Sequence, residues 1–429
     1  MSGVVKRMGF RTPWHLRVLY ISTFILRTAF GALLLLIAKY VPGETDYDLL
    51  LNVAIIAIPY PLAEMATANY FGILSDRIGR KPIIVAGTAL AAIVVTLYSL
   101  SNNIWFLAGM HGIHGIGAAA TVAPAIAMIA DKADPKDRGR QMGWFDYSTF
   151  IGYIVGAVLG GFLIDLTGTR LGFLVVAGFL ALSAWLLRKY VISEVPKSAK
   201  SHPSGFAELK QVFKNRDVRL MFPIWLIIAT LLGLAITYLP RILMSEGLSG
   251  TKIGLLFGAA GVALGLLQPF WGKVSDKVGR IPVMAYGVLS IFGLVIVLLV
   301  FPDQVYQYPP EGDVEFKIAG IAVLGLLGLG AGAFVPAALA FMADSSDEKY
   351  YGGTMGLYSF ALGFGALIAE VLGLAVILAS GAAQEAEKAP VWLLYVAAAL
   401  IGLAVAMMIV FFVSSWLGKR LGKHRPESG

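Results

Sequence analysis

Long apolar stretches alternate with short polar segments along almost the whole chain. A helix rises about 1.5 Å per residue, so about 20 mostly apolar residues cross the roughly 30 Å hydrocarbon layer of a bilayer. Twelve stretches are long enough. They cover residues 15–40, 48–74, 82–100, 103–130, 140–167, 170–190, 218–243, 251–275, 282–302, 317–343, 352–380 and 390–416. The pattern predicts an all-α membrane protein with twelve transmembrane helices.

The longest polar gap between predicted spans runs from Val191 to Asp217 and is rich in Pro, Ser and Lys. Such a composition is typical of a linker. Six spans precede the gap and six follow it. The sequence therefore predicts two six-helix bundles, 1–190 and 218–429, joined by a linker at 191–217.

Composition supports a membrane protein and excludes other classes. The 429 residues are 58% hydrophobic and 14% charged, whereas soluble domains carry about 25% charged residues. The net charge is +8, but the basic residues punctuate apolar runs instead of clustering in one polar domain, so no nucleic-acid partner is expected. The chain has no cysteine, which excludes disulfides and thiol nucleophiles.

Lys and Arg set the expected orientation. If the N-terminus is cytoplasmic, most basic residues fall in segments on that side, and the other side keeps few. The positive-inside rule then places both termini in the cytoplasm, in a plasma-membrane protein. The stretch His15–Tyr40 is too long for a signal-peptide core, so no cleavable signal peptide is expected.

A polar loop occurs twice. The first loop motif, Gly72–Pro82, matches the second loop motif, Gly272–Pro282, at a constant offset of 200. A further pair, Asp131–Gly143 and Asp344–Gly356, matches at an offset of 213. The repeated positions are Gly72, Asp76, Arg77, Gly79 and Arg80 in the first motif, and Gly272, Asp276, Gly279 and Arg280 in the second. The two halves are therefore predicted to be parallel structural repeats.

The first loop motif, Gly-x-x-x-Asp-Arg-x-Gly-Arg-Lys, resembles the hallmark between helices two and three of the major facilitator superfamily. The second is similar to the weaker copy in that family's second half, with Lys277 and Ile281 as departures. The resemblance covers the whole chain. It implies two bundles related by a pseudo-two-fold axis, and loops that act as a conformational latch holding the outward-facing state.

The residues of the first loop motif have a physical interpretation of their own. Gly72 and Gly79 allow tight turns and close helix contact. Asp76 can cap a helix start, and Arg80 is placed to pair with an acid at a neighbouring helix end, for which Asp131 is the candidate. The alternative is an ordinary loop whose positive charges only set the topology.

Predicted spans four and five carry two further patterns. His111 and His114 stand where the family's second motif, Arg-x-x-Gln-Gly-x-Gly, has Arg and Gln, and a histidine can carry a proton; helix-interface histidines are the alternative. The glycine run of span five is similar to the family's exporter motif, with Ala157 in place of its proline, but it also suits close helix packing anywhere in a membrane. The run consists of Gly152, Gly156, Gly160 and Gly161.

Ionisable residues inside spans are functional candidates by default because charges in hydrocarbon are costly. Arg27 and Glu64 lie at similar depths, roughly 15 Å at 1.5 Å per residue, so an ion pair between spans one and two is geometrically open, as either a functional or a structural pair. Tyr60 lies one turn from Glu64 between two prolines that predict a bend. Glu370 is expected in the outer half of span eleven.

The ionisable residues differ between the two halves of the repeat. Leucines stand at 264 and 324, the positions that correspond to Glu64 and His111. Proton coupling is therefore expected in the N-terminal half. Exporters with twelve spans tend to carry an acid in span one, where this chain has Arg27.

Other chemistry is not indicated. No phosphate-binding loop is present, no catalytic set stands out, and the two histidines lack acids at metal-ligand spacing, so no enzyme activity, cofactor or metal is expected. We expect a monomeric secondary active transporter that exports small amphipathic or drug-like molecules in exchange for protons, with membrane lipid around it. The alternatives are a symporter or uniporter for a sugar or organic anion, a lipid flippase, and a non-transporting receptor.

Overall fold

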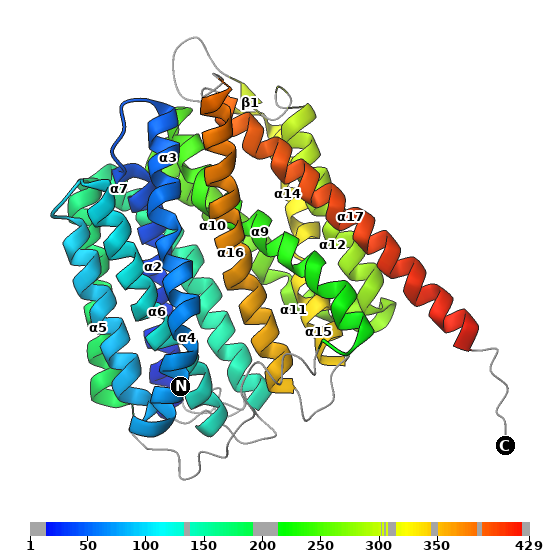
Figure 1. Cartoon of the computed structure of the whole chain (residues 1–429), viewed down its shortest axis with the longest axis horizontal. Helices are drawn as coiled ribbons and strands as arrows, with labels where there is room; N and C mark the ends of the chain where they lie inside the picture. Colours follow the sequence, from blue (N-terminus) through cyan, green and yellow to red (C-terminus); the bar gives the residue numbers. More distant parts are fainter. Residues whose placement is uncertain are drawn as a thin grey trace, which may run out of the picture. The chain divides into compact units, whose positions relative to one another are not determined.

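A computed structural model describes residues 14–132, 138–191, 213–301, 303, 306–307, 315–344, 351–383 and 388–422. These residues are almost entirely helical (Figure 1). The helices are α2 (Trp14–Tyr40), α3 (Asp46–Ala57), α4 (Pro59–Ile78), α5 (Arg80–Tyr98), α6 (Ile104–Lys132), α7 (Arg138–Tyr190), α9 (Arg216–Ser245), α10 (Gly250–Leu266), α11 (Gln268–Val278), α12 (Arg280–Val300), α14 (Ile318–Ala331), α15 (Phe334–Asp344), α16 (Tyr351–Ala382) and α17 (Ala389–Gly422). A short antiparallel pair, β1 (Tyr306–Gln307) and β2 (Glu315–Phe316), lies between α12 and α14.

The number of membrane spans agrees with the sequence. Eleven helical segments of the described chain are long and apolar enough to cross a bilayer. One of them, Tyr147–Tyr190, contains Gly168 at φ 72°, a conformation that interrupts the helix and that glycine adopts without steric cost. That segment is therefore two spans, and the twelve-helix prediction is confirmed.

Three of the described spans are broken along their length. α3 ends at Ala57 and α4 begins at Pro59, so the bend predicted in span two is present. A second break separates α10 from α11 before Pro269, and a third separates α14 from α15 near Gly332. Proline fits the first turn of a helix, where its missing N–H has no intrahelical partner, so Pro59 and Pro269 start new helices at these breaks.

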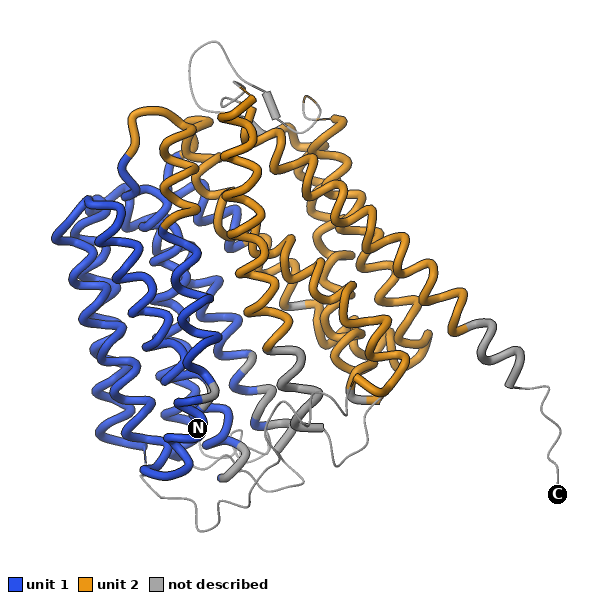
Figure 2. Tube along the Cα trace, viewed as in Figure 1, with its two compact units in different colours: residues 1–42, 56–200, 249–258 blue, residues 43–55, 201–248, 259–429 orange. Residues whose placement is uncertain are grey.

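Contacts divide the chain into two compact units (Figure 2). Unit 1 contains residues 1–42, 56–200 and 249–258, and unit 2 contains residues 43–55, 201–248 and 259–429. Each unit corresponds closely to one predicted bundle. Two short segments group with the other bundle, and most of the predicted linker lies outside the described residues.

The segment 249–258 is held in unit 1 by hydrogen bonds and close packing. The Asp165 carboxylate accepts the backbone N–H groups of Gly250 at 3.0 Å and Thr251 at 2.7 Å. An acid at a helix N-terminus accepts hydrogen bonds from free N–H groups and interacts favourably with the helix dipole. A side chain at Gly161 would collide with the Gly250 carbonyl, so this glycine brings α7 and α10 together.

Within unit 1, α2 packs along the first part of α7 through glycines spaced four residues apart. A Cβ added at Gly152 would lie 2.7 Å from the Arg27 Cβ, and one at Gly160 would lie 2.7 Å from the Ala32 Cα. Gly156 faces the Thr28 carbonyl at a similarly short distance. No side chain fits at these contacts, so the close-packing interpretation of the run is confirmed.

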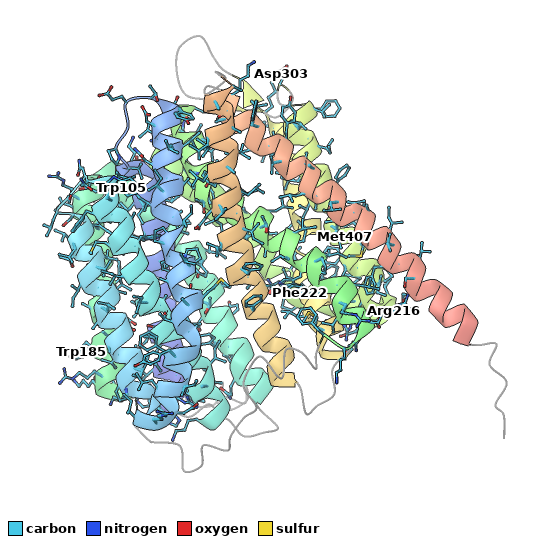
Figure 3. All side chains as sticks on the ribbon, in the orientation of Figure 1. Trp105, Trp185, Arg216, Phe222, Asp303 and Met407 are labelled. Atoms are coloured by element: carbon cyan, nitrogen blue, oxygen red, sulfur yellow. The ribbon has the colours of Figure 1, made fainter. Side chains whose placement is uncertain are left out.

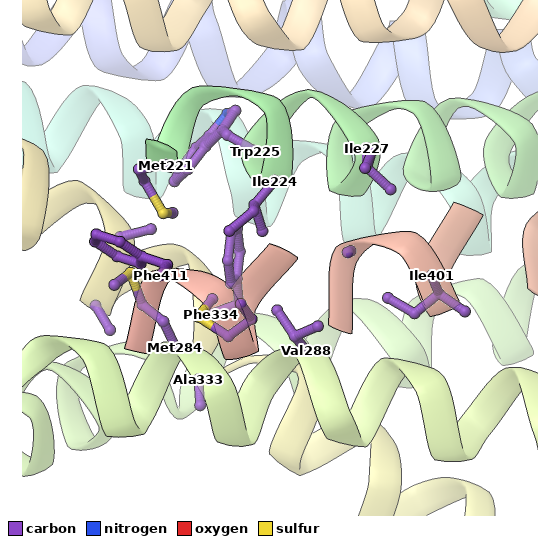
Figure 4. Packing of buried hydrophobic residues seen from close by; sticks show 14 of the residues in the cluster. Met221, Ile224, Trp225, Ile227, Met284, Val288, Ala333, Phe334, Ile401 and Phe411 are labelled. Atoms are coloured by element: carbon purple, nitrogen blue, oxygen red, sulfur yellow. The ribbon is translucent and has the colours of Figure 1, made fainter. Parts of the chain in front are cut away.

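Unit 2 has a continuous apolar core (Figure 4). Phe334 of α15 is 1% exposed and lies 5.5 Å from Trp225 of α9, measured between ring centroids. Met221, Val288 and Phe411 come from α9, α12 and α17 and belong to the same cluster. Aromatic and branched side chains from these helices thus fill the interior that their apolar sequences predict.

Exposed tryptophans mark the two ends of unit 1. Trp105 follows the start of α6 and is 71% exposed, and Trp185 lies near the end of α7 and is 50% exposed (Figure 3). Tryptophan is enriched at both membrane–water interfaces because its ring is apolar and its N–H is polar. Their positions near opposite ends of the spans suit an orientation of unit 1 across a bilayer.

Candidate functional site

The first loop motif joins α4 to α5 by a tight turn. Gly79 has φ 99°, which explains why glycine stands there. Arg80 donates to the Ser75 hydroxyl at 2.7 Å and forms an ion pair with Asp76. Asp76 lies in the last turn of α4 and does not cap α5, so the capping expected of it is not found. Arg77 is exposed.

The second loop motif repeats this geometry. Gly279 has φ 106°, and Arg280 donates to Ser275 at 2.8 Å and pairs with Asp276. Arg280 Nε also donates to the Asp344 carboxylate at 2.9 Å. Asp344 corresponds to Asp131, so this contact is the repeat's version of the expected Arg80–Asp131 pair; the Asp131 side chain is not among those described.

The space around the first glycine of each loop motif, Gly72 and Gly272, is open. A Cβ built at Gly72 or Gly272 meets nothing within 4 Å. Neither glycine is required for close helix contact within its unit, and neither has a positive φ. The tight turn expected at Gly79 is present, whereas no close helix contact at Gly72 is found within unit 1.

Arg27 is buried within unit 1, with 9% of its surface exposed. It donates to the Tyr153 hydroxyl at 3.0 Å, and its guanidinium carbon lies 5.4 Å from the centre of the Tyr153 ring. The ion pair with Glu64 is not formed: Glu64 is partly exposed on α4, and its charge acts on Arg27 only through space. A tyrosine from α7 thus takes the place of the expected acid.

A cluster of imidazole and phenol rings lies next to Arg27. A hydrogen bond of 2.8 Å joins the Tyr98 hydroxyl to His111 Nδ1. The Tyr60 ring lies 5.1 Å from the His111 ring and 5.3 Å from the His114 ring, between centroids. Phe30 of α2 completes the cluster at 5.4 Å from Tyr60. Three helices, α4, α5 and α6, therefore bring their polar rings to one place inside unit 1, and α2 adds the apolar ring of Phe30.

A small cavity of about 20 Å³ opens beside this cluster. Arg27, Tyr60, His114 and Thr121 contribute its polar lining, and the remaining walls are mostly apolar. Arg27 Nε and His114 Nδ1 are buried without a protein partner. The cavity is therefore lined by a guanidinium and an imidazole that each keep one nitrogen without a protein partner.

Glu370 is the predicted site residue in the second half of the chain. It lies on α16 in unit 2, is 8% exposed, and has a carboxylate oxygen, Oε2, without a protein partner. Its backbone carbonyl accepts the Tyr238 hydroxyl at 3.0 Å. The structure thus brings together Arg27, Tyr60, His111 and His114 within unit 1, with Glu64 nearby, whereas Glu370 belongs to unit 2.

Two tyrosines of the site were not predicted. Tyr153 follows Gly152 directly, so the glycine run that marks the α2–α7 contact could have indicated it. Tyr98 is the last residue of α5, and no motif around it indicates a role. Its partner, His111, lies in the next helix, so the contact cannot be read from the neighbouring sequence. Among the described residues, no group of three His, Cys, Asp or Glu side chains is arranged to hold a metal ion.

Twelve spans, two units and a repeated loop define a polytopic helical membrane protein with an internal repeat. The model of the Major Facilitator Superfamily matches residues 18–369 and 234–427 of the chain. The chain belongs to this superfamily and is a membrane transporter of that fold.

Relatives and solved structures agree with this assignment. The chain is 25% identical over 364 residues to the proton-coupled antiporter flippase LtaA of Staphylococcus epidermidis, and 26% identical over 365 residues to LtaA of Staphylococcus aureus. Each match covers 83% of this chain and 86% of the relative. The nucleoside transporter NupG has the same fold, with a TM-score of 0.71 at 12% identity over 94% of this chain and 99% of its own.

Proposed function

We propose that the chain is a proton-coupled antiporter that moves an amphipathic, lipid-like molecule across the membrane. The observation that carries this proposal is the buried set of Arg27, His111 and His114 with its tyrosines inside unit 1. Ionisable groups in a membrane protein interior are costly and mark ion or substrate pathways. The relatives named as proton-coupled antiporter flippases, matched over most of their length, favour this activity and a lipid-like substrate.

Arg27 and Glu64 have different roles in this proposal. Arg27 carries a permanent charge and is paired with the hydroxyl of Tyr153 instead of with an acid, so its charge is available to an anionic head group. Glu64 is partly exposed and lies within electrostatic range of Arg27, so its protonation changes the charge that a substrate meets. A proton drives transport only if its affinity differs between the two states of the transporter.

The two loop motifs act as latches in this cycle. Arg80 and Arg280 each hold a serine and an aspartate of their own loop, and Arg280 also holds Asp344. Such charged networks have discrete formed and broken arrangements, as a two-state element requires. We place both loops and both termini on the cytoplasmic side, as the distribution of Lys and Arg favours.

Flux measurements in proteoliposomes test the proposal. With an imposed pH gradient, the protein is expected to translocate a fluorescent anionic lipid and to move protons in the opposite direction. Glu64→Gln should abolish the effect of the gradient on lipid movement, whereas Glu246→Gln, an exposed acid after α9, should leave it intact. Gradient-driven lipid movement in the Glu64→Gln protein would remove Glu64 from the mechanism, and its absence in the unsubstituted protein would refute the proposed activity.

Export of drug-like molecules is a second candidate, favoured by the glycine run of α7 and its similarity to the exporter motif. The same vesicles can compare a panel of cationic and neutral amphipathic dyes with the anionic lipid. Proton release stimulated by dyes and not by the lipid would favour this second candidate.

A further inference from the structure

The guanidinium of Arg27 is held from one side by Tyr153. Its Nη1 donates to the Tyr153 hydroxyl at 3.0 Å, and its Nε is buried without a partner among the described residues. A guanidinium is planar and carries its five N–H donors in a fixed fork. Nη1 lies on the side of the carbon chain, whereas one N–H of Nη2 runs parallel to that of Nε along the other edge. The contact with Tyr153 therefore leaves the Nε edge of the group for another partner.

Tyr153 is itself fixed where α2 and α7 pack together. A Cβ at Gly31 would lie 2.7 Å from the Tyr153 carbonyl oxygen, and one at Gly152 would lie 2.7 Å from the Arg27 Cβ, so the two backbones are in close contact on both sides. The rings of Tyr153 and Phe30 lie edge to face, 5.6 Å apart between centroids. Such an arrangement of aromatic rings is favourable. The Tyr153 hydroxyl thus meets the guanidinium from a defined position.

The cavity of about 20 Å³ beside Arg27 has a second nitrogen without a partner. His114 lines this cavity together with Arg27 and Tyr60, and its Nδ1 is buried and unpaired among the described residues. Arg27 Nε can only donate, and His114 Nδ1 donates whenever it carries a proton. A buried charge costs free energy unless an opposite charge and hydrogen bonds compensate it, and Arg27 is paired with a hydroxyl instead of with an acid. The lining therefore favours an anion as ligand.

The shape of the Arg27 edge narrows the kind of anion. Arginine binds carboxylates and phosphates through two parallel N–H···O bonds, which add geometric specificity to the attraction between charges. Lysine carries the same charge but has no such fork. Because Tyr153 occupies Nη1, the edge formed by Nε and Nη2 is the one that matches two oxygens on a single phosphorus or carbon atom.

We propose that Tyr153 is a positioning residue that orients Arg27 so that Nε and Nη2 bind an oxyanion, a phosphate or a carboxylate, in the head group of the substrate. This inference rests on the proposed function and specifies the class of its substrate. Tyr153 lines neither cavity and acts only through Arg27. The present cavity holds about one water molecule, so the head group binds when the helices around the cavity separate.

Binding of short-chain lipids to the purified protein tests the role of the fork. Dihexanoyl phosphatidic acid offers a phosphate, decanoate offers a carboxylate, and dihexanoylglycerol is the neutral comparison. The anion that binds more tightly identifies the head group. Arg27→Lys keeps the charge and removes the fork, so the affinity for that anion should fall at least about tenfold while the affinity for the neutral lipid stays the same.

Arg241→Lys is the matched control in unit 2. Arg241 Nε is also buried without a partner among the described residues, but its Nη2 lies 3.6 Å from the Asp46 carboxylate. This variant should bind the anion as tightly as the unsubstituted protein. Binding of neither anion, an undiminished affinity in Arg27→Lys, or an equal loss for the neutral lipid would overturn the site.

Tyr153→Phe tests the positioning role because it keeps the ring beside Phe30 and removes only the hydroxyl. The Kd of the anion should rise about fivefold, with no change for the neutral lipid, since the guanidinium is no longer held in one orientation. Tyr238→Phe is the control: it removes a buried hydroxyl that donates to the Glu370 carbonyl at 3.0 Å, and it should leave the Kd unchanged. Equal Kd values in the two variants would overturn the positioning role.

The outcomes for this site and for the proposed function are separable. Anion binding that follows the expected pattern, in a protein that moves no lipid along a pH gradient, would refute the proposed function and leave the oxyanion site standing. Gradient-driven movement of lipid by a protein whose Arg27→Lys variant binds the anion undiminished would overturn the site and leave the proposed function standing.

Discussion

The interiors of the two units differ although their loops and spans repeat. Among the described side chains, unit 1 buries Arg27, His111 and His114 with tyrosine partners, whereas the core of unit 2 is apolar around Phe334 and the only charged side chain buried there is Glu370. The loop motifs kept the same turn and the same Ser–Asp–Arg contacts in both units. The two units are thus alike at the ends of these helices, while their helix interiors carry different chemistry.

The largest effect on the free energy of unfolding is expected from a substitution in the core of unit 2. Phe334→Ala removes a ring that is 1% exposed and packed on Trp225, so the free energy of unfolding in detergent should fall by about 3–5 kcal/mol. Phe360→Ala, on an exposed ring of α16, should change it by less than about 0.5 kcal/mol. A small effect at Phe334 would mean that unit 2 is not stabilised by this core.

The next effect comes from making unit 1 resemble unit 2. His111→Leu introduces the residue found at position 324, and gradient-driven transport should fall by about 100-fold, the scale of one lost proton-transfer group. Leu324→Met is the control in unit 2 and should leave transport near its original rate. Full transport by the His111→Leu protein would show that His111 only packs between helices.

A smaller effect is expected when the hydrogen bond of the ring cluster is removed but the ring that makes it is kept. Tyr98→Phe keeps the ring but removes the 2.8 Å bond to His111, so unfolding should become easier by about 0.5–1.5 kcal/mol. The pH profile of transport should shift, because His111 loses the partner that selects its tautomer. An unchanged profile would assign the bond to stability alone.

The smallest stability effect is expected at the loop contacts. Asp344→Asn weakens an exposed pair with Arg280, and such pairs contribute about 0–1 kcal/mol. Transport should change more than stability, since a latch affects the balance between two states. If stability and transport both stay the same, Asp344 has no latch role.

Hydropathy and repetition predicted the architecture well because both depend on local sequence. The twelve spans, the break before Pro59 and the positive φ of Gly79 follow from helix length, proline chemistry and the freedom of glycine. The site was predicted less completely. Arg27 was predicted from its depth along one helix, but depth does not specify which neighbour faces a side chain, and Tyr153 occupies the position expected for Glu64.

The contact of Gly152 with Arg27 has an evolutionary consequence. The glycine seam that holds α2 on α7 also sets where the guanidinium lies, because the Arg27 Cβ rests against Gly152. A larger residue at 152 would displace the cation as well as the helix. Positions 27 and 152 are therefore expected to covary among descendants of this lineage, with packing and charge inherited as one character.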